Sequence, residues 1–251
     1  MRVSVLASGS RGNSTYIETD NLKILVDLGT TSKYIENKLA ELGVSPSSID
    51  YILLTHDHSD HTSALKTFVR KYKTKVLLTE KLKPAIDNII VLENYLFLEK
   101  ENILLDLEIT SFKTSHDAVD SIGLIFKSNS KSIVYITDTG YINVKYFSML
   151  KNHNMYIMES NHDIEKLLNG KYRYDLKVRI LGDSGHLSNE MSSDYLKEFV
   201  GDKTEKIILI HLSEENNEVS LAYQMLKNKI SDKEIIIASQ NERTDLIDVW
   251  K

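Results

Sequence analysis

Short apolar runs separated by polar turns fill the first third of the chain. They predict strands over residues 2–7, 15–19, 23–27, 51–55 and 76–78. Asp20-Asn21 is typical of a tight hairpin turn between the second and third of these strands. Ile35, Leu39 and Leu42 recur at helical spacing before Gly43, and a second helix is expected over residues 63–72.

The rest of the chain alternates strands with helices. We expect strands over residues 103–112, 122–127, 132–137, 156–159, 206–211 and 235–238, and helices over 144–150, 189–200 and 219–226. Early hairpins followed by this alternation predict an α/β fold in which helices cover a mixed pair of sheets. Only two prolines and ten glycines interrupt the pattern, and no Ser/Gly/Pro-rich linker divides it, which favours a single domain over residues 1–251.

The composition narrows the chemistry that the chain can perform. Cysteine is absent, so any metal must bind His, Asp or Glu. The N-terminal stretch is too short for a secretory leader and no apolar run approaches a membrane span, so we expect a cytoplasmic protein without a membrane partner or an obligate protein partner. The net charge of −5 argues against nucleic acid, but two divalent cations would bring it close to neutral, and local patches matter more than the total.

A dense cluster of potential metal-binding side chains directly follows the strand expected over residues 51–55. His56, His58 and His61 lie within six residues, with Asp57 and Asp60 between them. In an extended chain His56 and His58 point the same way and can share one ion, while a bend lets Asp60 and His61 face a second. Imidazole and carboxylate suit zinc, and also manganese or iron. The alternative is a solvated loop in which histidines gather by chance, and the density of the cluster disfavours it.

One loop cannot complete two coordination shells, so further ligands must come from distant strand ends. His116, Asp138 and His211 each come directly after, or at the end of, an expected strand. Taken singly, a His or Asp in such a place is more often a capping or solvated residue. Together with the loop they form an ordered set, because α/β proteins build their sites where strands end.

This order, His-x-His-x-Asp-His followed by a lone His, a lone Asp and a final His, resembles the metallo-β-lactamase superfamily across nearly the whole chain. The resemblance implies a four-layer αββα sandwich with two divalent metal ions, zinc first, at one edge of its sheets. It implies one ion held by His56, His58 and His116. It implies a second ion held by Asp60, His61 and His211, with Asp138 bridging the two.

A narrower resemblance is to the YycJ/WalJ-like branch, whose members look like small nucleases. It rests on Ser8-Gly9-Ser10-Arg11-Gly12-Asn13-Ser14, Glu159-Ser160-Asn161-His162-Asp163, Ser184-Gly185-His186-Leu187-Ser188-Asn189 and His211-Leu212-Ser213-Glu214-Glu215-Asn216-Asn217. Where the branch usually carries prolines after Gly170, this chain has Lys171-Tyr172-Arg173-Tyr174, which bears on substrate contacts but not on the metal site. Neither the inserted domain nor the long arm of larger RNA-processing relatives is expected.

Three residues are expected to act in catalysis. Asp60 and Asp138 would do so at the metal ions, and His186 would protonate the leaving group. His186 lies in a loop that opens a helix, where free N–H groups can also meet a phosphate, and its alternative is a structural histidine bonded to that loop. For His162 we leave open whether it supports the site or starts a helix. His153 is expected in a solvated turn without a role.

Substrate contacts are expected from Ser10, Arg11, Asn13, Asn161, Arg173 and Ser188. For the loop 8–14 the alternative is a plain turn between two strands. Arg173 belongs to the basic segment 171–179, in which Tyr172 and Tyr174 are interleaved, and such a composition suits single-stranded nucleic acid. A second basic segment, 66–83, is better explained as a solvated helix face.

The leading hypothesis is therefore a metal-dependent hydrolase, namely a phosphodiesterase or exonuclease that acts on single-stranded nucleic acid, DNA before RNA. One alternative keeps the metal ions but hydrolyses a small molecule such as a cyclic phosphodiester, a thioester or a lactone, and the net negative charge favours it. A non-catalytic metal-binding regulator is disfavoured, because every expected ligand is present.

Overall fold

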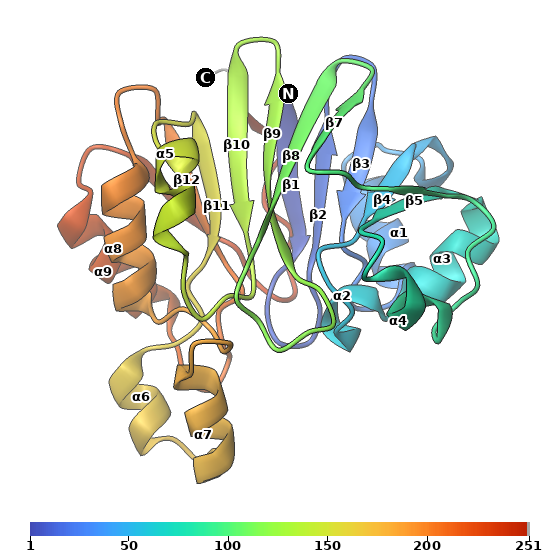
Figure 1. The fold of residues 1–251 in the computed structure, drawn as a ribbon. Helices are drawn as coiled ribbons and strands as arrows, with labels where there is room; N and C mark the ends of the chain where they lie inside the picture. The colour runs from blue at the N-terminus through green and yellow to red at the C-terminus, as the bar shows by residue number, and fades with distance from the viewer. Residues whose placement is uncertain (250–251) are drawn as a thin grey trace.

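Two seven-stranded mixed sheets face each other at the centre of the computed structural model (Figure 1). It describes residues 1–249, so Trp250 and Lys251, the last two positions of the expected domain, lie outside the described residues. In spatial order the first sheet contains β14 (Ile247–Asp248), β1 (Arg2–Ala7), β2 (Ser14–Glu18), β3 (Lys23–Val26), β4 (Tyr51–Leu53), β5 (Lys75–Leu78) and β6 (Tyr95–Phe97). The second contains β13 (Glu234–Ile237), β12 (Lys206–Ile210), β11 (Met155–Glu159), β10 (Lys131–Ile136), β9 (Ile122–Ser128), β8 (Leu107–Lys113) and β7 (Glu101–Leu104).

Strand direction explains why one edge of the sandwich collects the polar loops. In the first sheet β1 and β3 are both antiparallel to β2, and β3 and β4 are parallel, so these three strands end at the same edge. In the second sheet β8 and β10 are both antiparallel to β9, and β10, β11 and β12 are parallel. The loops that follow these strands are therefore neighbours within each sheet.

Helices cover the outer face of each sheet (Figure 1). The first sheet carries α1 (Ser32–Glu41), α3 (Leu65–Tyr72) and α4 (Lys83–Asp87), with α2 (Ser59–Thr62) and a 3₁₀ turn (Pro46–Ser48) between them. The second carries α5 (Phe147–Leu150) after a 3₁₀ turn (Val144–Tyr146), α8 (Asn189–Phe199) and α9 (Val219–Lys229). Among the described residues, no helix combines the length and the apolar character needed to cross a bilayer.

Three apolar clusters hold these layers together. Leu53 and Ile157 belong to the cluster between the two sheets. Phe68 of α3 belongs to the cluster that joins the helices to the first sheet, and Leu196 and Leu226 join α8 and α9 to the second. A helix layer, two sheets and a second helix layer make up the αββα sandwich, so the predicted fold class is confirmed.

A helical hairpin projects from the end of the sandwich at which these strands finish (Figure 1). It consists of α6 (Ile164–Asn169) and α7 (Tyr174–Leu181), and neither helix was expected from the sequence. Asp163 caps α6 by accepting a hydrogen bond from Lys166 N at 2.9 Å. Lys177 Nζ of α7 donates to Leu168 O at 2.7 Å and to Gly170 O at 2.8 Å, which ties the two helices together.

Two expectations from the sequence are wrong. Residues 103–112 do not form one strand but parts of β7 and β8, joined by a turn in which Leu105 has a φ of 53°. A turn residue of this kind is usually Gly or Asn, so leucine gave no turn signal. His153 is not solvated: the chain turns at Asn152, with φ 59°, and the buried imidazole reaches Ser132 Oγ at 2.9 Å and Met149 O at 2.8 Å.

Candidate metal centre

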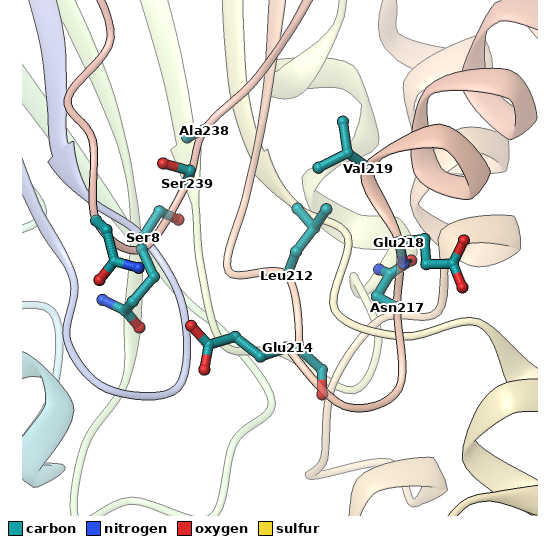
Figure 2. A pocket seen from close by; sticks show the side chains of 11 residues that line it. Ser8, Leu212, Glu214, Asn217, Glu218, Val219, Ala238 and Ser239 are labelled. Atoms are coloured by element: carbon teal, nitrogen blue, oxygen red, sulfur yellow. Dashed lines mark hydrogen bonds between the residues drawn. The ribbon is translucent and has the colours of Figure 1, made fainter.

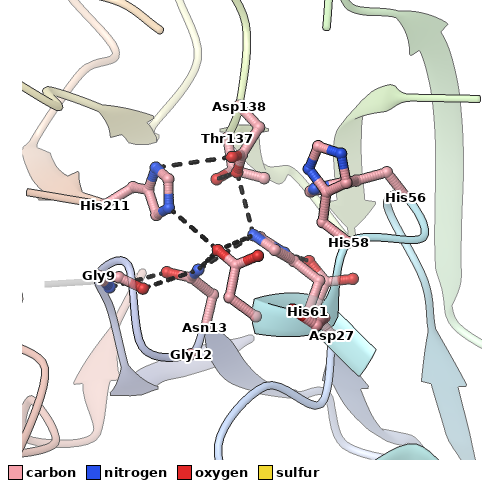
Figure 3. A network of polar contacts seen from close by, with 12 residues as sticks. Gly9, Gly12, Asn13, Asp27, His56, His58, His61, Thr137, Asp138 and His211 are labelled. Atoms are coloured by element: carbon pink, nitrogen blue, oxygen red, sulfur yellow. Dashed lines mark hydrogen bonds and ion pairs between the residues drawn. The ribbon is translucent and has the colours of Figure 1, made fainter. Parts of the chain in front are cut away.

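The expected ligands meet at the strand-end edge of the sandwich, where Figure 3 shows five of them: His56, His58, His61, Asp138 and His211. His56 lies in the loop after β4, and the chain then bends into α2, which carries Asp60 and His61 and has His58 as its N-cap. The remaining three come from the second sheet. They are His116 after β8, Asp138 after β10 and His211 after β12.

The ligand atoms form two groups, and a carboxylate of one group lies beside the other. Those of His56, His58 and His116 lie within 4.8 Å of one another, and so do those of Asp60, His61, Asp138 and His211. Asp138 is fully buried between the groups, with Oδ2 at 3.1 Å from His61 Nε2 and Oδ1 at 3.7 Å from His116 Nε2. The arrangement has room for one ion in each group and a shared ligand between them.

The spacing of these atoms fits tetrahedral metal coordination. Two ligand atoms at about 2.0 Å from one tetrahedral ion lie roughly 3.3 Å apart. His58 Nδ1 is 3.1 Å from His116 Nε2, and Asp60 Oδ2 is 3.5 Å from His211 Nε2. In addition, the buried Nε2 atoms of His56 and His211 have no hydrogen-bond partner among the described residues. An unpaired buried nitrogen is costly, and a bound cation satisfies it.

Hydrogen bonds on the far side of the rings fix which nitrogen faces the ions. Asp27 Oδ2 accepts from His61 Nδ1 at 2.7 Å and from Thr55 Oγ1 at 2.7 Å, and His56 Nδ1 in turn donates to Thr55 Oγ1 at 3.0 Å. His116 Nδ1 donates to Gly185 O at 3.1 Å. Each of these rings therefore presents Nε2 as a lone pair, which is the form that binds a metal. Asp27 supports one ring in each ligand group.

Glu159 has the same function on the other side of the centre. This fully buried carboxylate is on the last residue of β11, which pairs with Ile210 of β12, and it accepts from His211 Nδ1 at 2.8 Å and from His186 Nδ1 at 2.6 Å. Burial opposes its charge, but His186 and His211 outweigh burial and lower the pKa of Glu159 to about 2. Glu159 therefore stays ionised and couples a candidate ligand to the candidate general acid.

Histidines of the centre balance the charge of its carboxylates. Burial holds the pKa of His56 well below the usual value. Burial also opposes charge on His61, yet the carboxylates of Asp138 and Asp27 outweigh it and raise the pKa of His61 to about 10. Burial opposes the charge of Asp138 as well, but His211 and His61 hold its pKa well below the usual range. Divalent ions would take over this balance and displace the proton from His61.

Unusual backbone conformations mark the centre. Asp27, Asp138 and His211 have φ values of 60°, 40° and 57°, and each lies within two residues of the end of its strand. Non-glycine residues rarely adopt positive φ, and such strain concentrates at functional sites. Gly29 has a different constraint: a Cβ there would lie 1.9 Å from Asp60 O, so only glycine lets Asn13 N reach Asp60 O at 2.8 Å.

A cleft of about 240 Å³ opens onto the ligand groups. His58, Asp60, Asp138 and His211 line it, together with His186, whose Nδ1 lies 3.7 Å from Asp138 Oδ1. Part of the remaining lining comes from the α6–α7 hairpin and its connecting turn, through Tyr172, Leu176, Arg179 and Ile180. The hairpin therefore borders the space in which a substrate would meet the ions.

Two of the six residues expected to contact substrate line this cleft, namely Ser10 and Asn161. Two others are buried supports. Asn13 Nδ2 lies 3.3 Å from Asp60 Oδ2 and 3.1 Å from Gly9 O, and Ser188 Oγ caps α8 by accepting from Met191 N at 3.2 Å. Arg173 is on the hairpin, but its side chain is 86% exposed, pairs with Asp175 and does not line the cleft.

Arg11, the sixth, contacts two residues of a second pocket, and Figure 2 shows the lining of that pocket. Its guanidinium contacts Glu214 Oε1 at 2.5 Å and Asn241 Oδ1 at 3.3 Å, and both of these residues line a hollow of about 310 Å³. Ser213 lines this hollow as well as the cleft, so the two are adjacent. Arg11 therefore already forms an ion pair with Glu214, in the hollow next to the cleft.

Sequence reasoning gave no role to Asp27 or Glu159, and it considered Arg179 only as one member of the basic segment 171–179. Asp27 and Glu159 lie at strand ends, which was the signal used for His116 and Asp138, but a single acid there has many ordinary explanations. For His162 the sequence left open whether it supports the site or starts a helix, and in the structure it directly precedes Asp163, the N-cap of α6. Its side chain is buried, its ring nitrogens have no hydrogen-bond partner among the described residues, and burial lowers its pKa to about 4.

Comparison with known sequences agrees with this geometry. The profile described as "Metallo-beta-lactamase superfamily" matches residues 7–211. The chain is 40% identical over 241 residues to Exodeoxyribonuclease WalJ of Streptococcus pneumoniae serotype 2 (strain D39 / NCTC 7466), covering 93% of this chain and 90% of that protein. It is 36% identical over 238 residues to Exodeoxyribonuclease YycJ of Bacillus anthracis, with the same coverage of 93% and 90%.

Solved structures share the fold at low sequence identity. The metallo-beta-lactamase fold protein YhfI of Bacillus subtilis superposes with a TM-score of 0.73 at 16% identity and covers 97% of this chain and 99% of its own. The short form of human tRNase Z gives a TM-score of 0.68 at 14% identity, covering 98% and 99%. At these identities the likeness concerns the fold alone.

Proposed function

The chain belongs to the metallo-beta-lactamase superfamily, and on that premise we propose that it is an exonuclease that hydrolyses single-stranded DNA with two bound divalent ions. A metal-dependent nuclease activity follows from relatives called exodeoxyribonucleases that match nearly the whole chain. The preference for single strands, the number of ions and zinc as the metal, with manganese or iron as alternatives, are the finer parts of the proposal.

The observation that carries the proposal is the buried Asp138 carboxylate between two histidine-rich groups. One oxygen lies near His61 and the other near His116. When bound, divalent ions lower the pKa of water and polarise a phosphoryl oxygen. We assign His56, His58 and His116 to one ion, Asp60, His61 and His211 to the other, and Asp138 to both.

Proton transfer to the leaving oxygen is assigned to His186. As water adds to phosphorus and the P–O bond to the leaving nucleotide breaks, that oxygen needs a proton. Glu159 holds His186 Nδ1 at 2.6 Å, which leaves Nε2–H of the imidazolium for the transfer. The same contact fixes the orientation of the ring relative to the cleft. His186 lines the cleft, as this role requires.

The cleft favours a single strand over a duplex. Its volume of about 240 Å³ is below the roughly 300–1,000 Å³ of common ligand pockets, which suits one unit of a polymer better than a base pair. The basic residues of segment 171–179 lie on the hairpin beside it. Phosphate contacts from such residues are weakened by salt, because each contact releases a counterion.

The first test is metal content. Protein purified without chelators should contain about two divalent ions per chain by elemental analysis. A metal content near zero that neither zinc nor manganese restores would refute the assigned centre.

The second test distinguishes an exonuclease from an endonuclease and from a hydrolase of small molecules. Linear and circular oligonucleotides, labelled at either end, are incubated with the zinc- or manganese-loaded protein across a salt series. We expect mononucleotides from linear single strands, intact circles and a steep fall in rate with salt. Cut circles would indicate an endonuclease. Intact polymers together with hydrolysis of a small phosphodiester or thioester would support the small-molecule alternative, which the small cleft also accommodates.

A further inference from the structure

The two sides of α7 differ in what they contact. Leu176, Arg179 and Ile180 follow one another at helical spacing and line the cleft, and Tyr172, just before the helix, lines it too. Tyr174 projects elsewhere: it is 82% exposed and does not line the cleft. The helix therefore presents one side, with an aromatic ring, two aliphatic side chains and one cation, to the space above the candidate ligands.

Arg179 is held in a defined orientation on that side. Its Nε donates to Asp117 Oδ2 at 2.5 Å and its Nη2 to Asp117 Oδ1 at 2.9 Å, a two-point pair that fixes the plane of the guanidinium. Asp117 Oδ1 is itself 3.6 Å from His116 Nε2, so Arg179 is one side chain away from a candidate ligand. The pair uses two of the five N–H donors of arginine, and no further hydrogen bond of this guanidinium occurs within residues 1–249.

We propose that this side of α7 is the binding site for the terminal nucleotide of the substrate, with the remaining N–H donors of Arg179 on a phosphate and the Tyr172 ring against the base. The proposal rests on the exonuclease function proposed above and names the group that the cleft takes up. Arginine suits the phosphate because its planar donors match phosphate oxygens. The partly buried Tyr172 suits the base because every base has a face that stacks on an aromatic ring.

The lining also predicts how selective this site is. Leu176 and Ile180 offer apolar contact and no hydrogen-bonding group to a base edge. A site that stacks a base without reading its edge accepts all four bases. Its small volume has space for one nucleotide at a time. The site should therefore bind any deoxynucleoside monophosphate, the product of exonuclease cleavage, with similar affinity.

The hairpin supplies matched controls for both contacts. Arg173 and Tyr174 have the same side chains as Arg179 and Tyr172, belong to the same hairpin and do not line the cleft. General effects on charge or on hairpin stability should be similar within each pair. A difference between the members of a pair therefore reports the cleft itself.

The test is equilibrium binding of dAMP to the zinc-loaded protein, measured by titration calorimetry. Arg179→Ala should weaken binding about 10- to 100-fold, the usual worth of hydrogen bonds to a charged group. Tyr172→Ala should weaken it about tenfold, as loss of one base stack does. Arg173→Ala and Tyr174→Ala should stay within about twofold of the parent protein. Inorganic phosphate should lose affinity in Arg179→Ala but not in Tyr172→Ala.

Two conservative variants protect the test against misfolding. Arg179→Lys keeps the charge but not the planar pair of donors, so dAMP binding should remain weakened, whereas Tyr172→Phe keeps the ring and should restore it. Equal effects of Arg179→Ala and Arg173→Ala, or no measurable binding of dAMP to the parent protein, would overturn the proposal. If the protein cleaves DNA but dAMP binding does not depend on Arg179, the proposed nucleotide site is wrong and the exonuclease function stands. If dAMP binding depends on Arg179 but no polymer is cleaved, the nucleotide site stands and the exonuclease function is wrong.

Discussion

The metal edge and the α6–α7 hairpin border the same cleft but are built in opposite ways. At the metal edge, His56 and His61 are fully buried, and each ring is oriented by a hydrogen bond that leads to Asp27. On the hairpin, Arg173 and Tyr174 are mostly exposed, and Arg179 is half exposed. At the metal edge many buried contacts determine the geometry, whereas these hairpin side chains are exposed and Arg179 is oriented by its pair with Asp117 alone among the described residues.

This difference separates chemistry from recognition. Ligands and the candidate general acid must be held within a fraction of an ångström, and strand ends supported by buried carboxylates provide that precision. A strand end of DNA has no fixed shape, so residues that bind it gain from a surface whose side chains can move. The comparison therefore predicts that substitutions at the metal edge change the chemical step, whereas hairpin substitutions change binding.

The largest effect is expected at the Asp138 carboxylate. Asp138→Ala removes the carboxylate that belongs to one ligand group and lies beside His116 of the other, so it should abolish turnover together with metal binding. Asp60→Ala should abolish turnover by opening one group. Both proteins should still unfold cooperatively on heating, because three apolar clusters form the core without the centre. Elemental analysis, DNA cleavage and a thermal melt measure the three quantities. Arg179→Ala, which should keep its metal, is the control from the hairpin.

If Asp138→Ala kept both ions and full activity, the assignment of Asp138 as the bridging ligand would be wrong. Loss of folding in either variant would show that the metal edge is part of the stability of the fold, and the contrast with the hairpin would then concern stability and not chemistry.

The next effect belongs to His186, which lies where the two regions meet. His186→Ala should keep its metal yet lose about 10²- to 10⁴-fold in the rate of DNA cleavage, the usual contribution of a general acid. The structure makes this a strict test, because ligand atoms of His186, Glu159, Asp138 and His211 also lie within 4.8 Å of one another. Metal content and single-turnover rate are measured on the same sample. Loss of an ion would make His186 a ligand and its assigned role wrong.

How far the sequence could predict each region follows from the same contrast. His56, His58 and His61 were recognisable because their spacing after a strand restricts where they can point. Asp138 and His211 gained meaning from that cluster, since strands of one direction end at one edge. Asp27 and Glu159 obey the same rule, but nothing in the sequence identifies which histidine a lone carboxylate will contact.

The hairpin was beyond this kind of inference. Its helices have six and eight residues, which is too short for a clear apolar period. The basic composition of segment 171–179 indicated a role in substrate binding, but which arginine faces the cleft depends on where α7 begins. The choice of Arg173 rested on composition, and the structure instead lines the cleft with Arg179.

The smallest effect on activity is expected at His153, which precedes β11 and so lies at the opposite end of that strand from the metal edge. His153→Ala should leave DNA cleavage per folded molecule unchanged but lower the free energy of unfolding by about 1–3 kcal/mol, because Ser132 Oγ and Met149 O lose a buried partner. Burial lowers the pKa of His153 below its ordinary value of about 6.5, so the unfolded chain takes up this proton first as the pH falls. The parent protein therefore loses the contribution of His153 below about pH 6.5, and the stability gap to His153→Ala should be largest near pH 8 and narrow towards pH 5. Urea unfolding of both proteins at these pH values measures the gap, in which the shared titration of the metal edge cancels.

A gap that does not change with pH would mean that His153 is not held neutral by burial. A loss of DNA cleavage in His153→Ala would mean that residues away from the metal edge also contribute to the chemistry.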